Sequence, residues 1–298
     1  MTISAGIVLV GGSSSRMGSS KAWLEWHGST MLRRICGILG RVVDGPVVVV
    51  ASAGQALPPL GAGIEVVEDS RGGLGPLGGI AAGLKAVEGR AVLAYISSTD
   101  VPFLHPAFVK RVLAGLEGVD VCLPHVRCRS QPLAAGYRAS LCSTVERMVN
   151  EARVNEAARS RGRLRPQVLF DECRVRRLDD SVLLADAGVR TCDPGLDSVV
   201  NLNTPDEYAS ARSRPAPEVV IECSVMGSGR QLPGWAATRL VRVATLGAAA
   251  VEVGLRLDHK RVRIALNGGA ISPDPETPLV NGDTVSFVTS PAGPGGHS

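Results

Sequence analysis

Short apolar runs alternate with helix-like patterns through the first two hundred residues, and no other feature of the sequence restricts the fold as strongly. Runs rich in Val and Ile predict buried strands at Ile7–Val10, Val47–Ala51, Ile64–Val67 and Val92–Ile96. Between them, apolar residues recur at +3 and +4, as in amphipathic helices: Leu32, Ile35 and Leu39; Ile80, Leu84 and Val87; and Phe108, Val109, Val112, Leu113 and Leu116 after Pro106. This order predicts an α/β fold, a Rossmann-like three-layer domain with a mainly parallel sheet and helices on both faces.

The chain changes character near residue 210. Ser210–Pro217 is polar, basic and proline-rich, as linkers are. Beyond it, strand-like runs alternate with Asn-Gly turns; the runs are Val219–Ile221, Val262–Leu266 and Thr284–Val288, and the turns are Asn267–Gly269 and Asn281–Asp283. We therefore predict a first domain over residues 1–211, a linker over 212–217 and a second domain over 218–298, since roughly 80 residues suffice for a small domain.

Composition excludes several classes of function. The formal net charge of +4 suits a small polyanionic ligand but is too weak to indicate nucleic-acid binding. The sequence has no apolar run of about 18 residues, so no membrane span is expected, and the apolar residues 5–12 are interpreted as a strand rather than a secretion signal. Seven scattered cysteines argue against a disulfide framework and favour a reducing, cytoplasmic location.

A glycine-rich loop follows the first predicted strand, at Gly11–Lys21 (GGSSSRMGSSK). Glycines let the backbone approach a phosphate closely, and successive N–H groups bind anions; Arg16 and Lys21 add positive charge. The loop is neither a Walker A motif nor the dinucleotide-binding GxGxxG. A flexible loop with two solvated cations is the alternative. Its place at the carboxyl end of a strand, the usual ligand edge of such sheets, favours phosphate binding.

The stretch GGSSSRMGSSKAWLEWHG resembles the opening motif of the molybdenum cofactor guanylyltransferases, within the wider GT-A-like nucleotidyltransferases. The matching residues are Gly11, Gly12, Arg16, Met17, Gly18 and Lys21. The resemblance implies that Arg16 and Lys21 face the triphosphate as catalytic residues, with Lys21 neutralising charge as pyrophosphate leaves. It also implies a segment that holds the base and ribose, namely Leu9, Val10, Gly11 and Gly12.

A second stretch, Val67–Leu84, resembles the family's acidic residue followed by a Gly-Pro-Leu-x-Gly loop at a helix start. Asp69 would contact the nucleotide, because a carboxylate accepts hydrogen bonds from a guanine edge or a ribose. A solvated acid at a strand end is the alternative. The loop would line the nucleotide with backbone N–H groups; it consists of Gly75, Pro76, Leu77, Gly78 and Gly79.

A third stretch, Tyr95–Pro106, also matches in order. Asp100 follows a buried strand, and a carboxylate at that strand end is well placed to hold Mg²⁺ against phosphate oxygens. A turn or helix-cap aspartate is the alternative. The phosphate loop predicted at the same sheet edge favours the metal role, so Asp100 is the predicted catalytic Mg²⁺ ligand.

A fourth stretch, Val199–Tyr208, resembles the end of the family's catalytic domain. Asn201 and Asn203 would help to place the phosphate or the metal's water; the alternative is that this stretch only starts a helix. One departure weakens the guanine assignment. After the second strand the family often has an asparagine that contacts the nucleotide, and here Val50 or Ser52 stands in that place.

The resemblance implies that GMP is transferred from Mg²⁺-bound GTP to the phosphate of the molybdopterin cofactor, with release of pyrophosphate. A cytidylyltransferase acting on the same pterin is an alternative, although the paired glycines Gly11 and Gly12 favour the guanylyl branch. An alternative of another class is a non-catalytic module that binds the cofactor or presents the C-terminal domain; the presence of Lys21 and Asp100 argues against it.

Two further clusters predict no site. Cys122, His125 and Cys128 lie three residues apart, but a further pair of zinc ligands is missing from the sequence around them. The arginines from Arg153 to Arg177 are interpreted as a solvated basic surface, and contact with the pterin phosphate is the alternative.

The stretch Val262–Gly296 resembles the last strands, turns and diglycine of the ubiquitin-like β-grasp sulfur carriers of molybdopterin and thiazole synthesis. Those carriers activate the carboxylate of their final glycine, whereas His297 and Ser298 follow Gly296 here. We expect either trimming of these two residues, slightly favoured, or a docking module for molybdopterin-synthesis or molybdoenzyme-maturation proteins. A frayed tail is the alternative.

Overall fold

The structure is a computed structural model, and it describes residues 2–10, 20–69, 75–154, 165–225, 238–257 and 262–289 of the 298-residue chain. The chain divides into two compact units. The first comprises Met1–Trp26 and Thr30–Ala211, and the second comprises His27–Ser29 and Arg212–Ser298.

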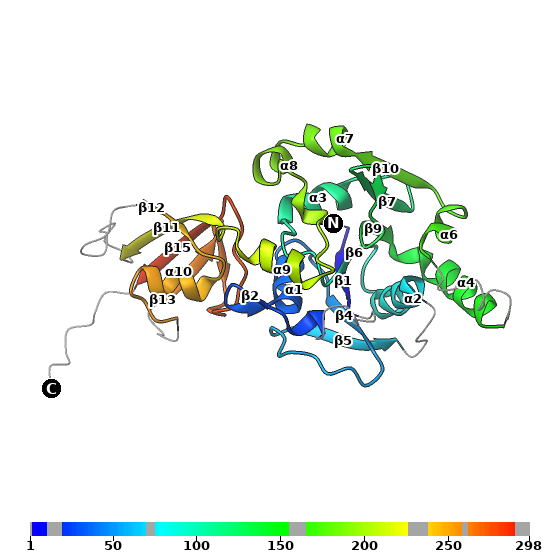
Figure 1. The fold of residues 1–298 in the computed structure, drawn as a ribbon, viewed down its shortest axis with the longest axis horizontal. Coiled ribbons are helices and arrows are strands. Elements are labelled where there is room, and N and C mark those ends of the chain that lie inside the picture. Colours follow the sequence, from blue (N-terminus) through cyan, green and yellow to red (C-terminus); the bar gives the residue numbers. More distant parts are fainter. Residues whose placement is uncertain are drawn as a thin grey trace. The chain divides into compact units, whose positions relative to one another are not determined.

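The first unit is built around one mixed sheet with strand order β10-β7-β9-β6-β1-β4-β5 (Figure 1). Its strands are β1 Ser4–Leu9, β4 Val47–Ser52, β5 Ile64–Asp69, β6 Leu93–Ser98, β7 Val121–Val126, β9 Ala134–Arg138 and β10 Val175–Asp179, with β8 Arg129–Ser130 paired to β7. Strand β1 is parallel to β4 and β6, β4 to β5, and β10 to β7. The predicted α/β fold with a mainly parallel sheet is confirmed. Strand β9 is antiparallel to β6 and β7, and its sequence (AAGYR) has no Val/Ile run that would have predicted it.

The helices predicted from apolar periodicity correspond to α1, α2 and α3. Helix α1 begins after Thr30, whose side chain accepts a hydrogen bond from Arg33 N at 3.2 Å. The helices of this part of the chain are α1 Met31–Gly40, α2 Pro76–Val87, α3 Pro106–Ala114, α4 Cys142–Val154, α6 Gln167–Phe170, α7 Asp180–Ala185, α8 Ala187–Cys192 and α9 Pro205–Arg212. Shorter elements are the 3₁₀ turns η1 Lys21–Trp23, η2 Ala139–Leu141 and η3 Asp197–Val199, and the strands β2 Glu25–Trp26 and β3 Ser29–Thr30.

Helices cover both faces of the sheet, as the contacts of β1 show. Successive side chains of a strand point to opposite faces. A Cβ on Gly6 would lie 3.0 Å from Leu39 of α1, whereas a Cβ on Gly83 of α2 would lie 2.4 Å from Ile7. Because Gly6 and Ile7 are neighbours in β1, α1 and α2 lie on opposite faces, and the unit has three layers.

The second unit has its own five-stranded sheet, with order β12-β11-β15-β13-β14. Its elements are β11 Glu218–Val225, β12 Thr238–Arg242, α10 Leu246–Glu252, β13 Val262–Leu266, β14 Gly269–Ile271 and β15 Thr284–Thr289. The adjacent strands β11 and β15 are parallel, and every other pair is antiparallel. Leu246 and Ala249 of α10 pack with Ile221 and Phe287 in a separate apolar core.

The predicted linker stretch is partly helical. Helix α9 continues through Ser210 to Arg212, and irregular chain follows as far as Pro217. In the part of the chain that the structure describes, every helix is too short or too polar to cross a membrane.

Candidate active site

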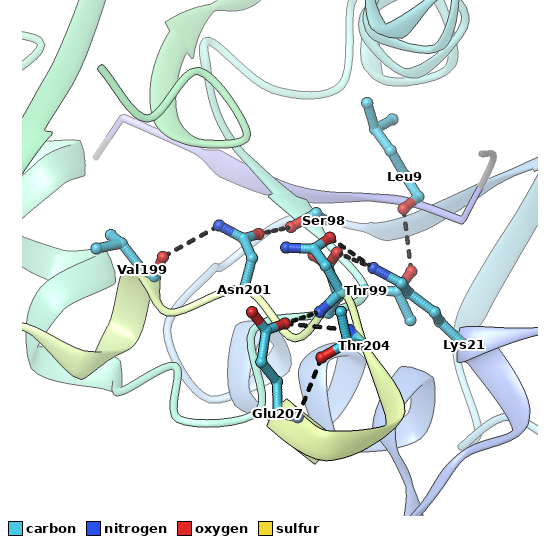
Figure 2. Close-up of polar contacts among 10 residues, drawn as sticks. Leu9, Lys21, Ser98, Thr99, Val199, Asn201, Thr204 and Glu207 are labelled. Carbon is cyan, nitrogen blue, oxygen red and sulfur yellow. Dashed lines mark hydrogen bonds and ion pairs between the residues drawn. The ribbon is translucent and has the colours of Figure 1, made fainter. Parts of the chain in front are cut away.

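The site lies where β1 and β6 end. The two strands are parallel neighbours, and their last residues, Leu9 and Ser98, face each other in register. The buried Thr99 links the ends of the two strands, because its Oγ1 donates a hydrogen bond to Leu9 O at 3.0 Å (Figure 2). The residue that follows, Asp100, therefore leaves the sheet at its carboxyl edge, where open α/β sheets bind ligands.

Lys21 lies between Asp100 and Asn203. Its Nζ is 2.6 Å from Asp100 Oδ2 and donates a second hydrogen bond to Asn203 Oδ1 at 3.0 Å. The Lys21 and Asp100 side chains are 20% and 16% exposed, so solvent screens this ion pair less than a surface pair. The other carboxylate oxygen, Asp100 Oδ1, is buried and has no hydrogen-bond partner within the described residues.

Asn201 and Asn203 flank the buried Leu202 on an irregular segment. Leu202 N donates to Asp100 O at 2.9 Å, which places the segment alongside Asp100. Asn201 Oδ1 accepts a 3.4 Å hydrogen bond from Ser98 Oγ, and its Nδ2 donates to Val199 O (Figure 2). The structure therefore brings both asparagines to the strand ends that carry Asp100.

The start of α9 fixes this segment. Glu207 accepts hydrogen bonds from Asn203 N at 2.6 Å and Thr204 N at 3.1 Å, while Thr204 Oγ1 accepts one from Glu207 N. This reciprocal pattern is a capping box, and Figure 2 shows the Thr204 and Glu207 side chains facing each other. The backbone N–H groups of Asn203 and Thr204, with the charge of Lys21 as a smaller contribution, lower the pKa of Glu207.

Asp69 and the loop before α2 lie together on the other side of β1, where β5 ends. Gly75 precedes α2 with φ +82°, a conformation that favours glycine, and Pro76 is the first helical residue. A Cβ on Gly78 would lie 3.2 Å from Asp69 Oδ2, so this carboxylate contacts the first turn of the helix, where unpaired N–H groups favour negative charge. Leu77 is fully buried in the core.

A model of the MobA-like NTP transferase domain matches residues 6–166, which is more than half of the chain. The chain belongs to this family. A molybdenum cofactor guanylyltransferase from Desulfosudis oleivorans is 31% identical over 210 residues, which cover 70% of this chain and 94% of that protein. A probable molybdenum cofactor guanylyltransferase from Mycobacterium marinum is 39% identical over 150 residues, which cover 49% of this chain and 73% of that one.

A solved structure agrees with this MobA-like assignment at the level of the fold. The molybdopterin-guanine dinucleotide biosynthesis protein A of Archaeoglobus fulgidus superposes with a TM-score of 0.52 at 22% identity, over 70% of this chain and 96% of that one. The matches confirm the predicted enzyme class, a nucleotidyltransferase. They also confirm the predicted relation to molybdenum cofactor guanylyltransferases, which rested on four short motifs in the right order.

Of the remaining predicted residues, the structure describes only some. Leu9 has its side chain buried in the core. Val10 N donates to Val50 O at 2.9 Å, and Val10 O accepts from Gln55 Nε2 at 3.5 Å. Gly11, Gly12 and Arg16 lie outside the described residues.

The residues that stabilise the edge of the site were not predicted from the sequence. Ser98 and Thr99 sit at the end of an apolar strand, and the polar run Ser-Ser-Thr before Asp100 was the available signal. The Thr-Pro-Asp-Glu order predicted a helix start, but not that Glu207 would accept a hydrogen bond from Asn203 N.

Cys122, His125 and Cys128, for which no site was predicted, lie in different environments. Cys122 is fully buried on β7 and burial raises its pKa to about 11, His125 contacts Ser130 Oγ at 3.2 Å, and Cys128 is exposed. Among the described residues, no group of three or more His, Cys, Asp or Glu side chains is arranged to hold a metal ion.

Proposed function

We propose that this chain transfers GMP from GTP to the terminal phosphate of the molybdopterin cofactor. An oxygen of that phosphate attacks the α-phosphorus of GTP, the bond from the α-phosphorus to the bridging oxygen breaks, and pyrophosphate leaves. The single observation that carries the proposal is the Lys21–Asp100–Asn203 cluster at the carboxyl edge of a sheet in a MobA-like transferase. The relatives named as molybdenum cofactor guanylyltransferases supply the substrate class.

The cluster fits a divalent metal ion, with Asp100 as its ligand. The carboxylate has one buried oxygen without a hydrogen-bond partner in the described part of the chain, and an unsatisfied buried carboxylate oxygen is costly unless a cation or donor meets it. Mg²⁺ takes one or two protein carboxylates and leaves its other positions to water and phosphate oxygens. Bound there, it would neutralise charge on the triphosphate.

The roles of the other residues follow from their charge and place. Lys21 supplies positive charge for the triphosphate, as we also propose for Arg16 of the glycine-rich loop. Leu9, Val10, Gly11 and Gly12 would hold the base and ribose, together with Asp69 and the loop formed by Gly75, Pro76, Leu77 and Gly78. Asn201 and Asn203 would place the phosphate or a metal-bound water. Catalysis would depend chiefly on positioning and charge neutralisation.

The base preference is tested by incubating the protein with molybdenum cofactor, Mg²⁺ and each of the four nucleoside triphosphates in turn. Pyrophosphate released with GTP alone supports the guanylyl reaction. Release with CTP would support the cytidylyl alternative, for which Val50 or Ser52 in place of the family's asparagine is the motivating observation. Release with none of the four would leave the chain as a binding module.

Asp100→Asn tests the metal role. The variant keeps the shape of the side chain but removes the charge, so turnover should fall by about two to four orders of magnitude while circular dichroism stays unchanged. The matched control is Asp206→Asn, because Asp206 is an exposed acid on α9, and its turnover should stay near that of the wild type. Near-normal turnover of Asp100→Asn would contradict the assignment.

For the second unit we propose a ubiquitin-like β-grasp domain over residues 218–298, after a linker over 212–217. The central parallel pair β11 and β15, with α10 against the sheet, supports this fold. Residues 290–298, with the diglycine, lie outside the described residues. Intact-mass measurement of protein from its own host separates the two expected roles: a thiocarboxylate on Gly296 supports a sulfur carrier, and retention of His297 and Ser298 supports docking to molybdopterin-synthesis or molybdoenzyme-maturation proteins.

A further inference from the structure

Aromatic residues make up only 3% of this chain, yet three of them meet on the segments that carry the site. The ring of Trp26 lies edge-on to Phe103, with centroids 5.4 Å apart and planes at 88°. Trp26 also approaches Tyr208, with centroids 6.4 Å apart. An edge-to-face pair such as Trp26–Phe103 stabilises the fold beyond the apolar area that it buries.

Each of the three rings follows one of the three polar residues of the cluster. Trp26 comes five residues after Lys21. Phe103 comes three residues after Asp100, and Tyr208 comes five residues after Asn203. Three segments that are distant in the sequence thus each contribute one polar group to the site and one ring to the aromatic cluster.

Further contacts tie these segments together. Tyr208 Oη donates a hydrogen bond to Glu25 O, next to Trp26. Leu202, which is 3% exposed, packs in the same apolar cluster and donates its N–H to Asp100 O at 2.9 Å. The cluster also contains the fully buried Met31. The apolar contacts and backbone hydrogen bonds therefore join the same three segments as the polar contacts of Lys21.

The polar contacts alone are poorly suited to hold this geometry. If Asp100 binds a metal ion and Lys21 binds phosphate, both groups exchange partners during each turnover, whereas the aromatic contacts remain. We propose that Trp26, Phe103 and Tyr208 are positioning residues. They hold Lys21, Asp100 and Asn203 at the relative positions that the transfer requires. The proposal rests on the proposed function. A displacement of about 1 Å can cost two orders of magnitude in rate.

The experiment compares two variants with two matched controls. Phe103→Leu removes a ring of the cluster. Its control is Phe170→Leu, which changes another half-buried phenylalanine, on α6. Figure 1 shows helix α6 on the far side of this unit from α9. Tyr208→Phe removes the hydroxyl that bonds Glu25 O; Tyr137→Phe removes one that bonds Pro132 O at 2.8 Å. Rates are measured with GTP, Mg²⁺ and molybdenum cofactor well below each variant's Tm, and amide exchange of Leu202 is measured without substrates.

Relative to its control, Phe103→Leu should lower kcat by about tenfold or more, while KM for GTP changes less than about threefold, because positioning acts on the transition state more than on binding. Tyr208→Phe should lower kcat by a smaller factor. In both variants the Leu202 amide should exchange faster than in the controls. A kcat of Phe103→Leu within twofold of that of Phe170→Leu overturns the proposal. Unchanged amide exchange at Leu202 in the two variants also overturns it. If the wild type itself releases no pyrophosphate, the proposed function has failed, and the exchange comparison alone decides the positioning role.

Discussion

The two carboxylate oxygens of Asp100 have different surroundings. Oδ2 accepts from Lys21 at 2.6 Å, whereas Oδ1 is buried without a hydrogen-bond partner in the described residues. From the sequence, Lys21 was a cation on a flexible loop; in the structure it is the countercharge of the predicted metal ligand. If Asp100 binds a divalent cation as proposed, Lys21 and that cation are alternative countercharges for its carboxylate.

Lys21→Met tests this relation by calorimetry. We expect the variant to bind Mg²⁺ alone more tightly than the wild type, because the ammonium no longer competes for Asp100. It should bind Mg-GTP about 10- to 100-fold more weakly, which corresponds to the loss of a charge-assisted hydrogen bond to phosphate. Lys85→Met is the control, because Lys85 pairs with Glu88 on an exposed helix surface. Unchanged GTP affinity in Lys21→Met would count against the phosphate role.

At the scale of elements, the close approach of α2 to the sheet depends on Gly83. A Cβ there would lie 2.4 Å from Ile7 and 3.3 Å from Val50. Gly83→Ala should therefore lower the free energy of unfolding by about 1–3 kcal/mol through overpacking. Gly40, at the end of α1, has nothing within 4 Å of its ideal Cβ, so Gly40→Ala should be neutral or stabilise by up to about 1 kcal/mol. Urea titration of the two variants checks both signs; equal effects would refute the packing explanation.

The capping box of α9 predicts a pH dependence. The native hydrogen bonds lower the pKa of Glu207 from 4.5, so its stabilising contribution is present above pH 4.5 and is lost as pH falls through the lower native pKa. The Tm advantage of the wild type over Glu207→Ala should therefore be constant near neutral pH and shrink below pH 4.5. Glu222→Ala, which removes an exposed acid of β11 that bonds Ser286, is the control. An advantage that is as large at pH 3 as at neutral pH would contradict the role of the charge.

At the scale of the whole molecule, the two units have separate apolar cores. In the second unit, Asn267 donates to the buried carboxylate of Asp283 at 2.8 Å and accepts from Thr284 N at 2.8 Å, so one side chain joins the two predicted turns. Its φ of +52° is one that asparagine tolerates.

Asn267→Ala should lower the stability of the second unit by about 1–3 kcal/mol, because it removes a donor from a buried carboxylate. Since the first unit has its own core, transfer activity at 25 °C should stay unchanged. Arg242→Gln, which breaks an exposed ion pair with Glu218, should cost at most about 1 kcal/mol. Differential scanning calorimetry beside an activity assay checks this, and a parallel loss of activity would show that the units are energetically coupled.

The sequence by itself determined the features that depend only on residues close together along the chain. Apolar runs and +3/+4 periodicity identified β1, β4, β5, β6 and the helices α1 to α3, because side chains must match the period of the element they belong to. Four short motifs in order identified the family. The sequence left β7, β9 and β10 unrecognised. Strand β9 (AAGYR) has no apolar run and becomes a strand only through the neighbours that it pairs with.

Only the tertiary structure decided which side chains meet. Lys21 bonds Asp100, 79 residues away, and Asn203, 182 residues away. These contacts exist because β1 lies between β6 and β4 in the sheet and because Leu202 is buried next to Asp100. Strand order and burial are set by the free energy of the whole core, to which every segment contributes at once. Local patterns therefore identified candidate site residues one by one, while their mutual contacts and the aromatic cluster that joins their segments came only from the folded chain.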